Sequence, residues 1–122
     1  MSAEQPCILL VEDDAALVDA LSFAFGLEGF RVRAYFMPQS LLDAAVPADA
    51  DCLVVDYNLP GMDGLSLVDR LRERGVALPA ILVTTQPTAQ LRRDAAAREV
   101  TIIEKPLLTD DLLRQVRSVA PG

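Results

Sequence analysis

The sequence alternates between short apolar runs and segments with the spacing of amphipathic helices. Three runs are apolar at every position: CILLV (7–11), CLVV (52–55) and AILV (80–83). Such runs are typical of strands buried on both faces of a parallel sheet. VTII (100–103) is a weaker candidate of the same kind. This alternation constrains the fold strongly, because parallel strands separated by helices form an α/β sheet with right-handed crossovers.

A fifth segment, FRVRAYF (30–36), has a different pattern and predicts an edge strand. Its residues alternate between two sets, as in a strand that buries only one face. The set expected to face inward is Phe30, Val32, Ala34 and Phe36, and the set expected to face outward is Arg31, Arg33 and Tyr35.

Helical spacing fills the gaps between the strands. After Asp14, a large apolar residue recurs every fourth position up to Gly29, which predicts the first helix. Proline suits a first helical turn, so a second helix is expected over 38–46. A third apolar stripe ends at Gly75. Its members are Leu65, Val68 and Leu71.

Two further helices complete the pattern. An alanine-rich helix is expected over 87–98, with Leu91 as its one large apolar anchor and therefore with weak packing. The last begins at Thr109, whose hydroxyl is expected to cap a helix that opens with two acids. Its residues expected to face inward are Leu112, Leu113, Val116 and Val119. Five βα units predict a doubly wound, five-stranded parallel sheet with helices on both faces, a three-layer αβα fold.

Composition narrows the possible functions. A chain of 122 residues, 52% hydrophobic and 24% charged, is expected to be a single globular domain. Its apolar runs are too short to span a membrane, and its N-terminus lacks the plan of a signal peptide, so we expect a cytoplasmic protein. Cys7 and Cys52 are then expected to be buried free thiols. A net charge of −7 argues against direct binding to nucleic acid.

The sequence has no histidine, which excludes Ser-His and Cys-His catalysis and His-ligated zinc. It also has a single lysine, Lys105, against ten arginines. That lysine stands directly after an apolar run and directly before a proline.

Polar residues follow the apolar runs where each strand is expected to end. They are Glu12, Asp13 and Asp14 after the first run, Asp56 after the second, Thr84 and Thr85 after the third, and Lys105 after the last. In a parallel sheet these positions share the carboxyl edge, where open α/β sheets bind ligands. Taken singly, each has an ordinary alternative as a helix cap, turn, strand-end or surface residue, and Asp14 is expected to cap the first helix. Their joint placement at successive strand ends indicates a site.

Several carboxylates close together repel one another unless a cation lies among them. Oxygen ligands without His or Cys favour a hard ion, and Mg²⁺ is the natural choice. A carboxylate beside a metal ion, a hydroxyl and an ammonium is the set of groups needed for phosphoryl transfer to aspartate.

The chain resembles the receiver domain of bacterial two-component response regulators over essentially its full length. The matching motifs, in the same order and spacing, are LLVEDD (9–14), VVDYNLPGMDG (54–64), ILVTT (81–85) and EKPL (104–107). The resemblance implies the flavodoxin-like strand order 2-1-3-4-5. It also implies residues 1–122 as one receiver domain without an output domain in this chain.

The resemblance also implies a role for each matching residue. Asp56 would be the phosphoacceptor, Thr84 the switch hydroxyl and Lys105 the cation that pairs with the phosphoryl group. The Mg²⁺ ligands would be Asp13 directly, Glu12 through water, Asp56, and Asn58 through its backbone carbonyl. Pro60, Gly61 and Gly64 would shape the loop after the acceptor, and the Lys105–Pro106 peptide would be cis.

Partners follow from the same resemblance. The phosphoryl donor would be a sensor histidine kinase or a phosphotransfer protein, and the output would be binding of a downstream protein or a phosphorelay. We expect no direct contact with nucleic acid or membrane, and a homodimer is left open. The protein is expected to be a phosphoacceptor rather than an enzyme, with slow autodephosphorylation.

The sequence departs from the family pattern at two positions. Thr85 stands where a small residue is usual, and its branched side chain is expected to narrow access to the acylphosphate. Ile102 stands where Tyr or Phe is usual, three residues before Lys105. We expect Ile102 to pack inward and the weakly anchored 87–98 helix to carry the conformational change instead.

Three other functions share some features with this sequence. A pseudo-receiver would bind partners without phosphorylation. Against this alternative, all five residues needed for phosphorylation are present: Glu12, Asp13, Asp56, Thr84 and Lys105. An aspartate-nucleophile phosphatase of the haloacid dehalogenase type has a DxD signature that DYN (56–58) resembles. In those enzymes, however, the acidic pair follows the nucleophile strand, whereas in this chain the acidic pair comes first. The second Asp of the signature, which is their general acid, is Asn58 here. A flavodoxin-like cofactor carrier needs a phosphate loop after the first strand, where this chain has three acids that would repel phosphate.

Overall fold

The structure, a computed structural model, describes residues 5–105 and 109–119. Its strands are β1 Cys7–Val11, β2 Arg31–Tyr35, β3 Ala50–Asp56, β4 Ala80–Thr84 and β5 Thr101–Glu104. Its helices are α1 Ala15–Leu27, α2 Pro38–Asp43, α3 Gly64–Glu73, α4 Ala89–Ala97 and α5 Thr109–Val119. Strands and helices alternate throughout, as the sequence predicts.

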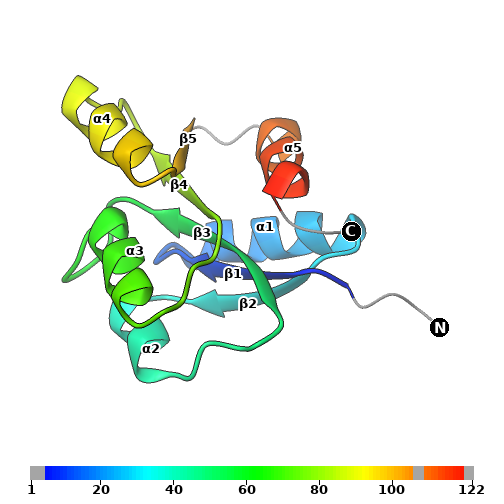
Figure 1. The fold of residues 1–122 in the computed structure, drawn as a ribbon. Coiled ribbons are helices and arrows are strands. Elements are labelled where there is room, and N and C mark those ends of the chain that lie inside the picture. Colours follow the sequence, from blue (N-terminus) through cyan, green and yellow to red (C-terminus); the bar gives the residue numbers. More distant parts are fainter. Residues whose placement is uncertain (1–4, 106–108, 120–122) are drawn as a thin grey trace.

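All neighbouring strands pair in parallel, in the order β2-β1-β3-β4-β5. The helices cover the sheet in two layers (Figure 1), with α1 and α5 on one face and α2, α3 and α4 on the other. The predicted doubly wound αβα fold and the predicted strand order are therefore confirmed. Within the described part of the chain, no helix is long and apolar enough to cross a membrane.

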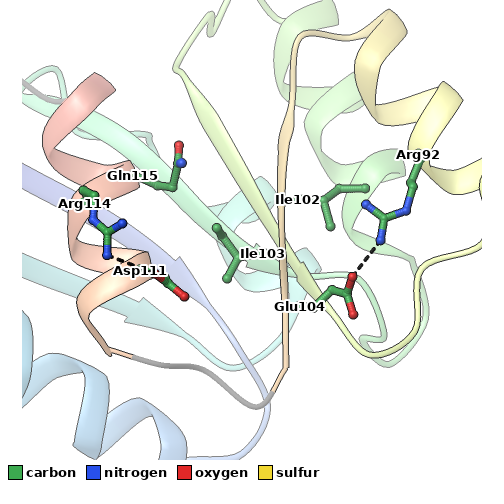
Figure 2. Close-up of a pocket in the computed structure, with 7 residues that line it drawn as sticks. All are labelled: Arg92, Ile102, Ile103, Glu104, Asp111, Arg114 and Gln115. Carbon is green, nitrogen blue, oxygen red and sulfur yellow. Dashed lines mark hydrogen bonds and ion pairs between the residues drawn. The ribbon is translucent and has the colours of Figure 1, made fainter.

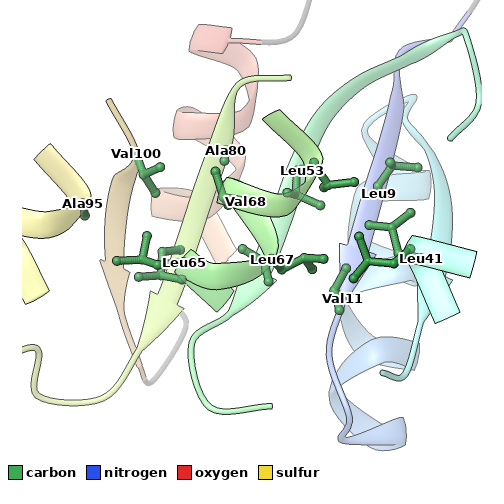
Figure 3. Close-up of a cluster of buried hydrophobic side chains, with 14 of the residues drawn as sticks. Leu9, Val11, Leu41, Leu53, Leu65, Leu67, Val68, Ala80, Ala95 and Val100 are labelled. Atoms are coloured by element: carbon green, nitrogen blue, oxygen red, sulfur yellow. The ribbon is translucent and has the colours of Figure 1, made fainter. Parts of the chain in front are cut away.

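The central strands separate two hydrophobic cores. β1 is buried at all five positions, so alternate residues enter opposite cores. Leu9 and Val11 pack with α2 and α3 in the core drawn in Figure 3, whereas Ile8 and Leu10 pack with α1 and α5 on the other face. Cys7 and Cys52 are buried free thiols that belong to different cores, as expected for structural cysteines.

The predicted burial of the edge strand was partly wrong. Phe30 is buried against Phe25 of α1, and Val32 packs in the same core. Ala34 is exposed, however, and Phe36 is 47% exposed because it lies beyond the end of β2. Tyr35, expected to face outward, instead packs against the core on the opposite face. An edge strand has fewer covering elements, so alternation alone did not determine which residues are buried.

Several helix boundaries differ from the predicted ones. α2 ends at Asp43, because Ala44 has extended backbone angles and Pro47 follows shortly. α4 begins at Ala89 rather than Pro87, because the hydroxyl of Thr88 accepts a hydrogen bond from the Leu91 N–H and caps the helix.

The start of α5 is only partly described. Thr109 is its first helical residue, and the predicted capping hydroxyl of Thr109 and the predicted cis peptide to Pro106 lie outside the described residues. Further along the helix, Leu112 and Val116 are buried and pack in the core with α1. The inward face of α5 is therefore the one that the sequence predicts.

Candidate functional site

The register of the sheet places the predicted site residues side by side. Val11 pairs with Val55, so Glu12 and Asp56 are the next residues on adjacent strands. In the same way, Asp56 pairs with Val83 of β4, and Thr84 is the next residue on that strand. Thr84 pairs with Glu104 of β5, and Lys105 is the next residue. The backbone N–H of Lys105 donates a hydrogen bond to the Thr84 carbonyl at 2.8 Å. The convergence expected at the carboxyl edge is therefore present in the structure.

Asp56 is the centre of this cluster. Its carboxyl group lies at the end of β3 and the residue is only 5% exposed. One carboxylate oxygen accepts a hydrogen bond from the Asn58 N–H at 3.2 Å, and the other accepts from Lys105 Nζ at 3.0 Å. A buried carboxylate that points to the sheet edge with a cation on one oxygen is suited to nucleophilic chemistry at that edge.

Gly64 explains how helix α3 approaches Asp56 so closely. A Cβ atom at position 64 would lie 2.5 Å from the backbone carbonyl oxygen of Asp56 and 2.8 Å from a methyl carbon of Leu82. Only glycine fits at this distance, and its N–H donates to the Tyr57 carbonyl at 2.9 Å. The loop from Asp56 to α3 is thereby held against the sheet, and Asp63 caps α3 by accepting from the Ser66 N–H at 2.8 Å.

Three carboxylates form the acidic part of the site. One oxygen each from Glu12, Asp13 and Asp56 lie within 4.8 Å of one another. Glu12 is 3% exposed, and one of its oxygens accepts a hydrogen bond from the Asp14 N–H at 3.1 Å. Burial raises the pKa of the Glu12 carboxyl from 4.5 to about 7, and the charge of Asp56 adds to the increase.

The donor set of this cluster fits a divalent hard cation. All three side chains offer oxygen, which Mg²⁺ prefers, and a cation among them would offset the repulsion between the three carboxylates. Glu12, Asp13 and Asp56 would hold the ion, and the backbone of Asn58 is joined to Asp56 next to them. Asp14, by contrast, caps α1 by accepting from the Ala16 and Leu17 N–H groups, as predicted.

Lys105 bridges two of the acids. Its Nζ lies 3.0 Å from Asp56 and 3.7 Å from Glu12, and its side chain is 26% exposed. Burial lowers the pKa of the ammonium, but the hydrogen bond to Asp56 and the charge of Glu12 outweigh that effect and raise the pKa above its ordinary value. A narrow ammonium can contact both carboxylates at one point, whereas a planar guanidinium would need more room.

Thr84 and Thr85 differ sharply in exposure. Thr84 is 2% exposed at the end of β4, and its hydroxyl donates to the Thr85 carbonyl at 3.4 Å. Thr85 is exposed at the start of the loop to α4. The hydroxyl predicted to respond to a phosphoryl group is therefore bonded to the backbone of that loop.

Ile102 lies on the side of β5 that faces α4 (Figure 2). Figure 2 shows Ile102 directed toward α4 and Ile103 toward α5, on the two sides of β5. Both line a hollow of about 330 Å³ that Arg92 and Arg114 also border. Ile102 is half-buried and packs against the core shared by α3 and α4, so the expected inward packing is confirmed.

Some features of the site were not predicted. The contact of Lys105 with Glu12 depends on rotamers, which sequence patterns do not specify. The Asp63 cap could have been found, because an Asp at the start of a helix is a common capping signal. The close approach of Gly64 to Asp56 had only a weak signal, the glycine itself.

Comparison with known proteins identifies relatives of the chain. The family described as the response regulator receiver domain matches residues 8–117. The transcriptional regulatory protein FixJ of Bradyrhizobium diazoefficiens is 31% identical over 112 residues, which cover 91% of this chain and 55% of FixJ. The transcriptional activator protein PfeR of Pseudomonas aeruginosa is 35% identical over 125 residues, which cover 96% of this chain and 41% of PfeR.

The chain thus spans about half the length of the curated relatives it matches. Among solved structures, the non-phosphorylated HemR receiver domain of Leptospira biflexa superposes with a TM-score of 0.86 at 28% identity, covering 94% of each chain. Sequence and fold therefore point to the same group of proteins.

Proposed function

Because the chain belongs to the response regulator receiver domain family, we propose that it accepts a phosphoryl group on Asp56 from a partner histidine kinase or phosphotransfer protein. Phosphorylation-dependent signalling is the general function of this family, and the proposal assigns its chemistry to named residues. The observation that carries it is the buried Asp56 carboxylate, with Lys105 Nζ 3.0 Å from one oxygen and two further acids within 4.8 Å.

The proposed transfer is a single displacement at phosphorus. A carboxylate oxygen of Asp56 attacks the phosphorus atom of a phosphohistidine, and the P–O bond forms as the donor P–N bond breaks. The imidazole nitrogen leaves with the electrons of that bond. Bound Mg²⁺ would neutralise negative charge on the phosphoryl oxygens. Glu12, Asp13 and Asp56 would hold the ion together with the backbone carbonyl of Asn58.

Two residues of the chain would stabilise the product. The ammonium of Lys105 already contacts Asp56 and would pair with a phosphoryl oxygen. The Thr84 hydroxyl would exchange its bond to the Thr85 carbonyl for one to the phosphoryl group. Thr85, exposed beside Thr84, would restrict the access of water and thereby slow hydrolysis of the acylphosphate.

The output is proposed to be binding of a downstream protein or transfer in a phosphorelay. Two of the relatives are named as a transcriptional regulatory protein and a transcriptional activator, and each extends well beyond the region that matches this chain. A direct contact of this chain with DNA is disfavoured by its net charge of −7. We therefore propose that its signal passes through protein contacts.

Intact-mass measurement tests this function. Protein incubated with Mg²⁺ and acetyl phosphate is expected to gain one phosphoryl group, and chelation of Mg²⁺ should prevent the gain. Asp56→Asn keeps the size of the side chain but lacks the nucleophilic carboxylate, so it should gain nothing. A wild-type protein that gains no mass would support the pseudo-receiver alternative. An Asp56→Asn variant that gains as much mass as wild type would show that another residue accepts the phosphoryl group.

A further inference from the structure

Helix α4 is held to the molecule by few apolar contacts. Of its nine residues only Leu91 and Ala95 are buried, and Leu91 is the only large one. Both belong to the core that α4 shares with α3, where Ile102 also packs. The position of this helix therefore depends on what surrounds Leu91.

Leu91 borders a cavity of about 200 Å³. The cavity lies between the end of β3, the loop from β4 to α4, and the first turn of α4. Tyr57 and Thr84 also line it. Tyr57 directly follows Asp56 and is itself half-buried against the same core. The residue after Asp56 and the main anchor of α4 thus line the same cavity, which is open to solvent on one side.

The loop beside this cavity has two features of a switchable segment. The Thr84 hydroxyl donates to the Thr85 carbonyl, a bond that the proposed phosphorylation would break. The next residue, Gln86, has a φ of 44°, in the left-handed region that a non-glycine residue rarely adopts. Such a backbone conformation costs on the order of 1 kcal/mol or more and persists only while its surroundings hold it.

The two ends of α4 are attached differently. At its C-terminal end, Arg98 pairs with Asp69 of α3 through Nε at 2.8 Å and Nη2 at 3.1 Å, and Arg72 donates to the Arg98 carbonyl. At its N-terminal end, the one ion pair to β5 is Arg92–Glu104, with both side chains more than half exposed (Figure 2). The polar contacts to α3 are therefore concentrated at the C-terminal end, whereas the N-terminal end is held to the molecule mainly by Leu91 and one exposed ion pair.

From these contacts we infer that Tyr57 and Leu91 are positioning residues that carry the phosphorylation signal from Asp56 to α4. When Thr84 releases the Thr85 carbonyl, the loop shifts, and Leu91 moves within the cavity against the Tyr57 ring while Arg98 holds the far end of the helix. Arg92 is the next residue on α4, so this motion alters the outer surface between α4 and β5. This inference rests on the proposed phosphorylation of Asp56 and assigns the route of its output.

Ile102 has a different position from Tyr57. It also packs against the core with Leu91, but it lines the hollow between α4, β5 and α5 and not the cavity that Tyr57 and Leu91 line. A change at Ile102 should therefore alter local packing without blocking the motion of Leu91 into the cavity. Ile102→Val, which removes one methyl group, is thus the matched control.

Amide hydrogen exchange, with and without acetyl phosphate and Mg²⁺, measures this coupling. Wild type is expected to show a change in exchange over residues 85–97 on phosphorylation. Tyr57→Ala should still gain one phosphoryl group by mass, but the change over 85–97 should fall to less than half of the wild-type value. Tyr57→Phe, which keeps the ring, should restore the change, and Ile102→Val should leave it near wild type.

Leu91→Phe gives an independent test, because its ring extends into the cavity and should also block the response of 85–97 without preventing phosphorylation. Circular dichroism will show whether Tyr57→Ala folds. If it does not, Leu91→Phe replaces it as the test of the coupling. The inference is overturned if both Tyr57→Ala and Leu91→Phe gain mass and respond like wild type, or if Ile102→Val alone abolishes the response. Loss of mass gain in wild type would instead overturn the proposed function itself.

Discussion

The buried carboxyl of Glu12 should make the folding stability depend on pH in a way that one substitution removes. Glu12 is 3% exposed, and burial raises its pKa from 4.5 to about 7. A carboxyl whose pKa is higher in the folded than in the unfolded state favours folding when it is protonated. The contribution of protonated Glu12 to the free energy of unfolding is therefore fully present below pH 4.5 and is lost as the pH rises through 7.

The size of the effect follows from the two pKa values. Each pKa unit corresponds to ~1.4 kcal/mol, so the difference between 4.5 and 7 is worth about 3 kcal/mol. Glu12→Gln keeps the side-chain shape and an oxygen that can accept the Asp14 N–H, but it has no charge to bury. The attraction between Lys105 and Glu12 lowers the pKa of Glu12, and the value of about 7 already includes that effect. The loss of this attraction in the variant is therefore already counted in the difference of about 3 kcal/mol. Without Mg²⁺, the variant should exceed wild type in unfolding free energy by about 3 kcal/mol at pH 8 and by little at pH 4.5.

Urea denaturation followed by circular dichroism measures this difference across the pH range. Added Mg²⁺ should reduce the advantage of Glu12→Gln, because a metal ion that binds the folded state stabilises wild type and the variant has lost one carboxylate ligand. Glu73→Gln, an exposed change on α3, is the matched control and should show no such pH-dependent gain. Parallel stability curves for wild type and Glu12→Gln from pH 4.5 to 8 would refute the argument from burial.

Three further substitutions test other parts of the site. Gly64→Ala should destabilise the fold by roughly 1–3 kcal/mol in urea denaturation and slow phosphorylation of Asp56, because its Cβ meets the Asp56 carbonyl at 2.5 Å. Gly26→Ala, in open space within α1, should instead be neutral or stabilising by up to about 1 kcal/mol. Lys105→Arg should keep the melting temperature but lose the spectral response to beryllofluoride, and full signalling by this variant would contradict its assigned role. Thr85→Ala should shorten the lifetime of the acylphosphate severalfold, measured by the decay of phosphorylated mass, and an unchanged lifetime would show that Thr85 does not restrict access.

The sequence predicts which residues meet at the carboxyl edge of the sheet, because the register of a parallel sheet leaves little freedom. Once Val11, Val55 and Ile103 are interior strand residues, the residues that follow each strand must meet at one edge. The gathering of Glu12 and Asp56 therefore follows from strand ends alone, without knowledge of rotamers.

Features that depend on side-chain packing could not be predicted in the same way. Phe36 was expected to be inside because it continues an alternating pattern, but the strand ends one residue earlier. The cavity beside Leu91 and the position of Tyr57 at its edge arise from the shapes of neighbouring side chains, which no spacing rule encodes. The contacts of Lys105 with both Asp56 and Glu12 likewise depend on the conformation of the long lysine side chain, which spacing in the sequence does not specify.

The central claim is that Asp56, and neither of the two acids beside it, carries the phosphoryl group. Borohydride reduces an aspartyl phosphate to homoserine and releases phosphate, so treatment of the phosphorylated protein followed by peptide sequencing locates the acylphosphate directly. Homoserine is expected at position 56 in wild type and should be absent from Asp56→Asn. Homoserine at position 13, a reduced residue at position 12, or no reduced residue in protein that has gained phosphoryl mass would contradict the assignment.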